Sequence, residues 1–212
     1  METPLIIDHH LSWPNGTPKK RPRTLGLVVH HTAGNPRTET VETIHAYHRD
    51  HNSWLGIGYN WLIAADGTIH LGRPDGTIGA HCTGINSDYA GVALSGNFMK
   101  AEPTDSQLDS CAKLWAWLSE RYGWDLDPGT LTGHRDHQRG NSCPGDGLYS
   151  KLGIIVLRGR QFARGGILEW QGHTLTYSMS SDGSTALVGV RELADALGLE
   201  IDVRGWPHIV VR

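Results

Sequence analysis

VVHHTAG, residues 28–34, closes an apolar run with two adjacent histidines. The run begins at Leu25, and its β-branched residues predict a buried strand over residues 25–33. Successive side chains of a strand point to opposite faces of the sheet. Only one of His30 and His31 can therefore face any one site, and the other must point away.

Strand and helix signals continue on both sides of this run. Residues 1–24 are rich in proline and polar residues and predict a leader that wraps the domain. Thr38 is a candidate N-cap for a helix that ends near His51. Further elements follow in order: a hairpin around Asp66-Gly67, a strand at 91–98, a helix from Thr104 to Gly123, a loop at 133–147 and a short helix near 147–157. This order predicts an α/β fold with a mixed central sheet flanked by helices.

Composition excludes several classes of protein. The 212 residues suit one full domain with a small appendage. A net charge of −3 argues against a nucleic-acid partner, and no apolar run reaches the roughly 18 residues of a membrane span. No N-terminal stretch has the basic flank and apolar core of a signal peptide. The sequence thus predicts synthesis in a reducing cytosol, with Cys82 and Cys111 as free thiols packed in the core.

Cys143 differs from the other cysteines because it lies in a polar loop, NSCPGD, residues 141–146. His134 lies nine positions earlier in the same loop. One histidine at a strand end and a later histidine and cysteine can form a three-ligand site. Imidazole nitrogen and thiolate are zinc ligands, whereas calcium and magnesium prefer oxygen, and a catalytic zinc keeps one position for water. Spacing alone leaves two interpretations open, a metal site or unrelated loop residues.

Four blocks occur in a fixed order: LGLVVHHTAG (25–34), GIGYNWLIAADGTIHLGR (56–73), GAHCTGINSDYAGVALSGNF (79–98), and TGHRDH with SCPGD (132–137 and 142–146). Over about residues 1–157 they resemble the zinc-dependent N-acetylmuramoyl-L-alanine amidases of the phage lysozyme and peptidoglycan recognition protein type. The resemblance implies a peptidoglycan recognition protein-like fold and one Zn²⁺ per chain. It also implies that His30, His134 and Cys143 are the ligands and that His31 points away.

The same resemblance assigns roles around the metal. It places Tyr59 near the metal, where Tyr59 and Asn141 are expected to stabilise an oxyanion. The family has Lys or Thr at the position of Asn141, and asparagine donates a hydrogen bond but supplies no positive charge. His81 and Asn86 are expected to line the substrate groove. Trp54 is a candidate for an exposed aromatic residue of that groove.

Other polar residues in these segments have less specific interpretations. Three histidines recur at helical spacing without an acidic or thiol partner and are expected to form a solvated or groove-edge face: His45, His48 and His51. Asp136 and His137 either orient His134 or are polar loop residues.

Gly165-Gly166 marks a boundary between residues 1–160, the expected zinc amidase domain, and residues 166–212. The second segment predicts two short strands, a helix near 189–198 and a last strand, and therefore a small α+β domain. It resembles the stalk-like N-terminal domain of copper amine oxidases, which is also attached to some cell-wall enzymes. That resemblance implies cell-wall attachment and no copper chemistry. A C-terminal extension packed on the first domain is the alternative.

The resemblance of the first segment implies a hydrolase that cleaves the amide bond between N-acetylmuramic acid and L-alanine of bacterial peptidoglycan. Without an export signal, the chain suits a phage endolysin, a monomer made in the host cytoplasm that reaches the cell wall after release. Two alternatives remain: a non-catalytic peptidoglycan-binding protein of the same fold, and a zinc peptidase that cuts within the stem peptide. Binding relatives usually lack the cysteine, so Cys143 favours catalysis.

Overall fold

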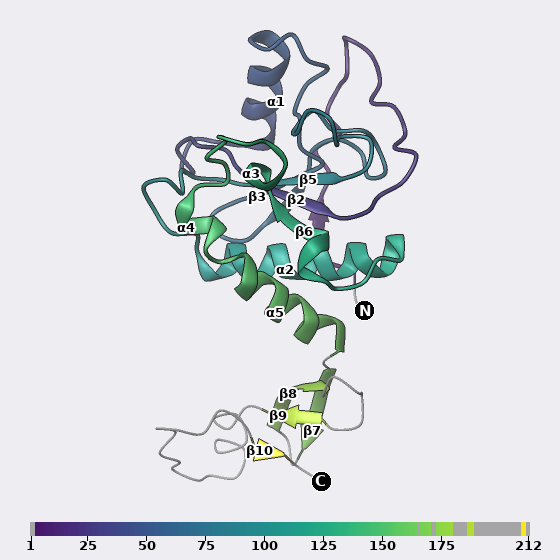
Figure 1. Ribbon diagram of the computed structural model, residues 1–212, viewed down its shortest axis with the longest axis vertical. Coiled ribbons are helices and arrows are strands. Elements are labelled where there is room, and N and C mark those ends of the chain that lie inside the picture. The colour runs from purple at the N-terminus through teal and green to yellow at the C-terminus, as the bar shows by residue number, and fades with distance from the viewer. Residues whose placement is uncertain (1–2, 165, 171–172, 180–185, 189–208, 211–212) are drawn as a thin grey trace.

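The structure is a computed structural model that describes residues 3–164, 166–170, 173–179, 186–188 and 209–210, with side chains through residue 163. Its first part is a six-stranded sheet with helices on both faces (Figure 1). The strands are β1 (Ile6–Ile7), β2 (Leu27–His31), β3 (Trp61–Ile63), β4 (Ile69–Leu71), β5 (Ala90–Leu94) and β6 (Leu131–Gly133). Their order is β1-β4-β3-β5-β2-β6, and only the β3–β4 hairpin is antiparallel. The predicted mixed α/β sheet is confirmed.

Helices cover the two faces of this sheet. They are α1 (Val41–Asp50), α2 (Asp105–Tyr122), α3 (His134–His137), α4 (Asp146–Tyr149) and α5 (Leu152–Arg164), with a 3-10 turn at Pro128–Thr130. Figure 1 shows α1 on one side of the sheet, and α2 with α5 on the other. Leu27 and Val29 of β2 belong to the large apolar cluster on the α2 side. Because side chains alternate along β2, His30 points to the α1 side and His31 to the α2 side.

Several predicted elements need correction. The N-cap of α1 is Thr40 and not Thr38, because the backbone N–H of Thr38 donates to Asn35 in a preceding turn. The leader supplies an edge strand, β1, which pairs with β4. The segment expected to be a loop at 133–147 begins with α3, directly after β6. The short helix near 147–157 is instead two helices, α4 and α5.

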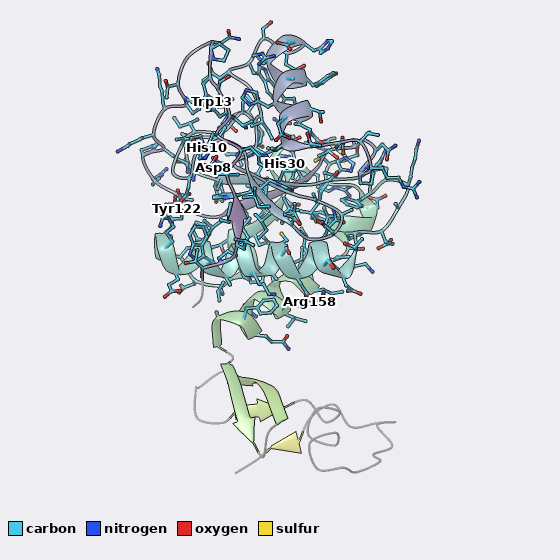
Figure 2. The ribbon with its side chains drawn as sticks, turned by 180° about the vertical axis from the view of Figure 1, so that it is seen from behind. Asp8, His10, Trp13, His30, Tyr122 and Arg158 are labelled. Carbon is cyan, nitrogen blue, oxygen red and sulfur yellow. The ribbon has the colours of Figure 1, made fainter. Side chains whose placement is uncertain are left out.

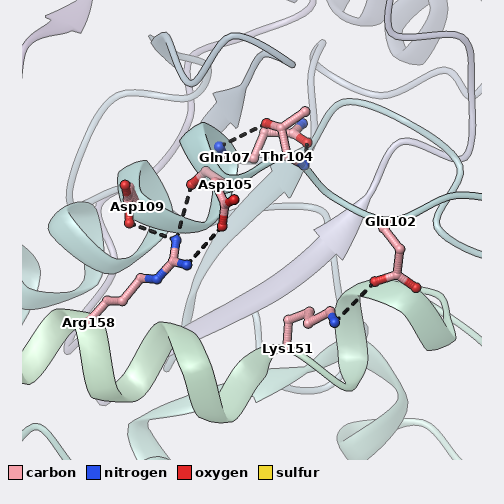
Figure 3. Close-up of polar contacts among 7 residues, drawn as sticks. All are labelled: Glu102, Thr104, Asp105, Gln107, Asp109, Lys151 and Arg158. Atoms are coloured by element: carbon pink, nitrogen blue, oxygen red, sulfur yellow. Dashed lines mark hydrogen bonds and ion pairs between the residues drawn. The ribbon is translucent and has the colours of Figure 1, made fainter. Parts of the chain in front are cut away.

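Polar contacts attach α5 to the start of α2 (Figure 3). The guanidinium of Arg158 donates to Asp105 and to Asp109 at 2.8 Å each, and Lys151 lies 3.5 Å from Glu102. Beside them, Thr104 caps α2 by accepting from the Gln107 N–H. These ion pairs lie at the surface, where each contributes only about 0.2–1 kcal/mol to stability. They define where α5 lies against α2 and add little to the stability of the fold.

The C-terminal segment forms a second sheet. Strands β7 (Gly166–Trp170), β8 (His173–Met179), β9 (Ala186–Val188) and β10 (Ile209–Val210) pair antiparallel in the order β10-β9-β8-β7. The helix predicted near residues 189–198 lies outside the described residues. The division of the chain into two domains stays a prediction.

Candidate metal centre

Three side chains from distant parts of the chain converge near the carboxyl end of β2. One potential ligand atom from each of His30, His134 and Cys143 lies within 4.8 Å of the other two. The His30 Nδ1 is 3.6 Å from the Cys143 Sγ, and the two imidazole rings are 4.6 Å apart between centroids. Figure 2 shows His30 at the sheet, between α1 and α2. In the described part of the chain no other group of His, Cys, Asp or Glu converges in this way.

The parallel strands bring the two histidines together. β2 and β6 are hydrogen-bonded neighbours with Val29 opposite Gly133, so His30 and His134 occupy adjacent positions one residue further on. Cys143 returns to the same place through the loop after α3. Its carbonyl accepts from the backbone N–H of Arg135 at 2.9 Å. The Arg135 guanidinium donates to the Ser142 carbonyl and to the Asp146 carboxylate, which holds the loop closed.

The donor set fits zinc. Zinc–nitrogen bonds of about 2.0–2.1 Å and zinc–sulfur bonds of about 2.3 Å put tetrahedral N and S ligands about 3.5 Å apart. The observed separation of 3.6 Å between His30 Nδ1 and Cys143 Sγ matches this distance. Two imidazoles and one thiolate also leave a fourth tetrahedral position without a protein ligand among these residues.

The two imidazoles are in the protonation state that a metal requires, whereas the thiol must first lose a proton. Burial lowers the pKa of His30 well below 6.5, and neighbouring histidines lower it further. Burial also lowers the pKa of His134, so both rings are neutral at pH 7. Burial raises the pKa of the Cys143 thiol to about 11, and this proton must leave when a metal binds.

Each of the two histidines has a second side chain within hydrogen-bonding distance of its Nε2. The Nε2 of His30 is 3.0 Å from the Nδ1 of His81, and the Nε2 of His134 is 2.9 Å from the Oε1 of Gln138. The orienting residue of His134 is therefore Gln138. Of the two candidates expected from sequence, Asp136 instead accepts from the Gly133 N–H and the Tyr149 hydroxyl.

His81 is placed differently from the expectation for a groove residue. Its side chain is buried, with a relative exposure of 7% for the residue, and it lies behind His30. Asn86 supports this arrangement because its Oδ1 accepts from the backbone N–H groups of His81 and Cys82 at 2.9 and 3.0 Å. Contact of either residue with substrate stays a prediction.

Tyr59 and Asn141 lie beside the centre. The ring of Tyr59 is 5.3 Å from that of His30, and burial, followed by the charges of Cys143 and Glu39, raises the pKa of its hydroxyl. Tyr59 therefore stays a protonated donor. Asn141 uses both ends of its amide within the protein: its Oδ1 accepts from the Cys143 N–H at 2.8 Å, and its Nδ2 donates to Gln138 at 3.2 Å.

Comparison with known proteins places this geometry in a family. Residues 20–146, more than half of the chain, match the family Amidase_2, described as N-acetylmuramoyl-L-alanine amidase. The chain belongs to this family.

Three relatives illustrate the similarity of the chain to known proteins. The N-acetylmuramoyl-L-alanine amidase of Homo sapiens is 35% identical over 146 residues, which are 65% of this chain and 25% of that protein. Peptidoglycan-recognition protein SC2 of Drosophila melanogaster is 35% identical over 132 residues, 59% of this chain and 70% of that protein. The solved structure of N-acetylmuramoyl-L-alanine amidase LysC from Clostridium intestinale URNW has a TM-score of 0.63 at 32% identity and covers 73% of this chain and 99% of that chain. The chain thus spans about a quarter of the human relative.

The three histidines at α1 in this Amidase_2 chain, expected to form a solvated or groove-edge face, differ in burial: His45 is buried, which departs from that expectation, and His48 is half-buried. The buried ring of His45 accepts from the Ile57 N–H and bonds to the Ser12 carbonyl. The ring of His48 accepts from the Gly58 N–H at 3.0 Å. Only His51 is exposed, where it stacks on Tyr47. Trp54, 38% exposed, lies against His48 at 5.0 Å between ring centroids.

The remaining cysteines of this Amidase_2 chain agree with the expectation from sequence. Cys82 and Cys111 are free and buried. Among the described helices, none has the length and apolar character that crossing a membrane requires.

Proposed function

We propose that this chain is a zinc-dependent hydrolase that cleaves the amide bond between N-acetylmuramic acid and L-alanine of peptidoglycan. The observation that carries the proposal is the convergence of His30, His134 and Cys143 within 4.8 Å in a member of the Amidase_2 family. A bound zinc supplies a water of lowered pKa and polarises the scissile carbonyl.

The other residues of the centre have roles that follow from their placement. Tyr59 keeps its proton, and its ring lies 5.3 Å from that of His30, so its hydroxyl is the candidate donor to an oxyanion that develops on the carbonyl. Asn141 holds the Cys143 loop against Gln138, which in turn bonds to the ring of His134. We therefore assign Tyr59 the donor role and Asn141 a role in holding the ligands. Trp54, exposed next to His48, is the candidate to contact the glycan or peptide.

A non-catalytic peptidoglycan-binding protein is the second candidate, because recognition proteins are among the relatives of this chain. Three converging donors, two of them imidazoles that are neutral at pH 7, favour catalysis over binding alone. We further propose that the chain acts as a monomeric phage endolysin, made in the host cytoplasm and acting on the bacterial wall after release. The similarity to the amidase LysC supports the amidase activity that this role requires.

The experiment measures metal content and products together. Purified protein should carry about one zinc per chain and clear a peptidoglycan suspension, and a chelator should stop the clearing. New amino-terminal alanine should appear without new reducing sugar. Reducing ends would indicate a glycosidase, amino termini from within the stem would indicate a peptidase, and binding without any product would leave a recognition protein.

Substitution of cysteines supplies the matched control. Cys143→Ser should remove the activity and most of the zinc, because the hydroxyl of serine is a poor zinc ligand. Cys82→Ser changes a buried free cysteine outside the ligand set and should keep the zinc. Equal losses of zinc in both variants would overturn the assignment of Cys143.

A further inference from the structure

His30 and His81 form a hydrogen-bonded pair of buried imidazoles behind the metal centre. The His30 Nε2 is 3.0 Å from the His81 Nδ1, and their rings are nearly perpendicular at 76°. The far nitrogen of His81, Nε2, is 3.3 Å from the backbone carbonyl of Tyr89. The result is a chain of three polar groups that ends on a carbonyl.

The Tyr89 carbonyl determines which nitrogen of each imidazole carries the proton. A carbonyl oxygen only accepts, so the His81 Nε2 must carry the proton that it donates to Tyr89. Both rings are buried, at 1% and 7% exposure, and in the described part of the chain neither has a hydrogen bond to a carboxylate. They are therefore neutral, since an unpaired buried charge is costly. A neutral His81 protonated on Nε2 accepts at Nδ1, which requires the proton of His30 to lie on Nε2.

We propose that His81 is a positioning residue that locks His30 in the Nε2–H tautomer, so that Nδ1 carries the lone pair directed toward Cys143. This inference rests on the proposed zinc-binding role of His30. Without an acceptor at His81, the proton of His30 could move to Nδ1, and the ring would then offer no lone pair to a metal at that atom.

The backbone approaches the His81 ring closely at two glycines. Gly79 and Gly91 both lie against the ring, and a Cβ added at either glycine would collide with it. Gly91 belongs to β5 and Gly79 to the preceding loop, so two separate segments lack side chains at this point. The lack of side chains at these two positions lets the ring lie where its Nδ1 meets the Nε2 of His30.

The tautomer is measured directly on the zinc-free protein. Long-range ¹H–¹⁵N correlation spectra of ¹⁵N-histidine-labelled chain should show the protonated nitrogen of His30 coupled to both carbon-bound ring protons, which identifies Nε2–H. The His30 signals are assigned from their loss in His30→Ala. A protonated Nδ1 in the intact chain would overturn the inference, whether or not the protein is an amidase.

Zinc affinity tests the consequence, by competition with a chelating indicator. His81→Phe keeps a ring but removes the acceptor and should weaken zinc binding about 10–100-fold, the usual effect of losing such a partner. His81→Asn keeps an acceptor next to Cγ, as Nδ1 is, and should recover most of the affinity. The matched control is His70→Phe, which breaks a second histidine pair, the 2.9 Å contact between His9 and His70, away from the ligands.

The outcomes separate this inference from the proposed function. If the intact chain binds no zinc, the proposed function fails. If it binds zinc and His81→Phe binds equally well, the proposed function stands and the role of His81 is wrong. If His70→Phe loses as much affinity as His81→Phe, the loss reflects general destabilisation and the role of His81 is again wrong. Should His81→Phe fail to fold, the spectra of the intact chain and the affinity of His81→Asn still decide.

Discussion

The thiol of Cys143 must lose a proton before its sulfur can bind a metal. Burial raises the pKa of this thiol to about 11, so in the zinc-free protein it is protonated at pH 6 to 8. The pKa of His30 is lowered, so that ring is already neutral and releases nothing. We expect zinc binding at about pH 6 to release close to one proton, and the apparent affinity to rise about tenfold per pH unit. Calorimetry in buffers of different ionisation enthalpy measures the released proton.

Cys143→Ser is the control for this measurement, because a serine hydroxyl has no proton to lose at this pH. Its residual zinc binding should release almost none. Zinc binding to the intact chain without proton release would mean that Cys143 is not a ligand.

Asn141 connects the ligand loop to the partner of His134. Asn141→Ala removes the bonds to the Cys143 N–H and to Gln138, each worth about 1 kcal/mol. We expect zinc affinity to fall about tenfold, together with turnover, as measured by competition with a chelator. Asn35→Ala is the control, since Asn35 caps a turn outside the centre by accepting from the Arg37 N–H. Loss of turnover at unchanged zinc affinity would restore Asn141 to the oxyanion role predicted from sequence.

At the scale of single residues, the sequence predicts the metal ligands better than the side chains that orient them. His30, His134 and Cys143 stand out because the blocks shared with the family single them out, and the structure brings them together. The partners behind them carry no such signal. Gln138 meets His134 through one helical turn, and His81 meets His30 across 51 positions of sequence. Such contacts depend on the packing of strands that local patterns do not specify.

Helix α2 begins and ends at capping residues that the sequence identifies. Thr104 accepts from the Gln107 N–H, Gln107 returns a bond to the Thr104 N–H, and Gly123 ends the helix with a φ of 72°. Thr104→Ala should lower the free energy of unfolding by about 1 kcal/mol, since it leaves helix donors unpaired. Denaturant unfolding measures the change.

Thr38 supplies the control for that prediction. It resembles a cap in sequence, but the cap of α1 is Thr40, so Thr38→Ala should change the free energy of unfolding by less than about 0.5 kcal/mol. Thr104→Ser keeps the hydroxyl and should stay close to the intact chain. Equal effects of Thr38→Ala and Thr104→Ala would contradict the importance of the capping box.

Elements with a clear period, a cap or a turn signal could be predicted from sequence, and very short elements without such a signal could not. β2, the β3–β4 hairpin and α2 have clear periodicity or turn signals. β1, β6 and α3 are two to four residues long, which is too short for any period to show. These short elements matter for the centre, because β6 places His134 next to His30. The sequence does not show that His45 and His48 accept hydrogen bonds, because their partners, the Ile57 and Gly58 N–H groups, lie in the following loop.

At the scale of the whole chain, the centre and both apolar clusters belong to the first sheet and to the helices and loops packed on it. The last described members of the large cluster lie in α5: Ile155, Val156 and Phe162. The family match ends earlier, at residue 146. The ligands therefore do not depend on the strands of the second sheet, β7 to β10, for any contact that the described residues show.

This organisation predicts how the chain responds to truncation. A chain of residues 1–164 should keep the zinc affinity of the full chain, and its melting temperature should fall by less than about 4 °C, which corresponds to about 1 kcal/mol at this size. A chain ended at residue 150 is the contrast, because it loses Ile155 and Val156 from the core and the bonds of Arg158 to α2. That shorter chain should not fold at 25 °C, since removing a core helix costs more than a domain's marginal stability. If the 1–164 chain instead melts more than about 10 °C below the full chain, a stability change beyond 2 kcal/mol, residues 166–212 are an extension packed on the first domain and not a domain of their own.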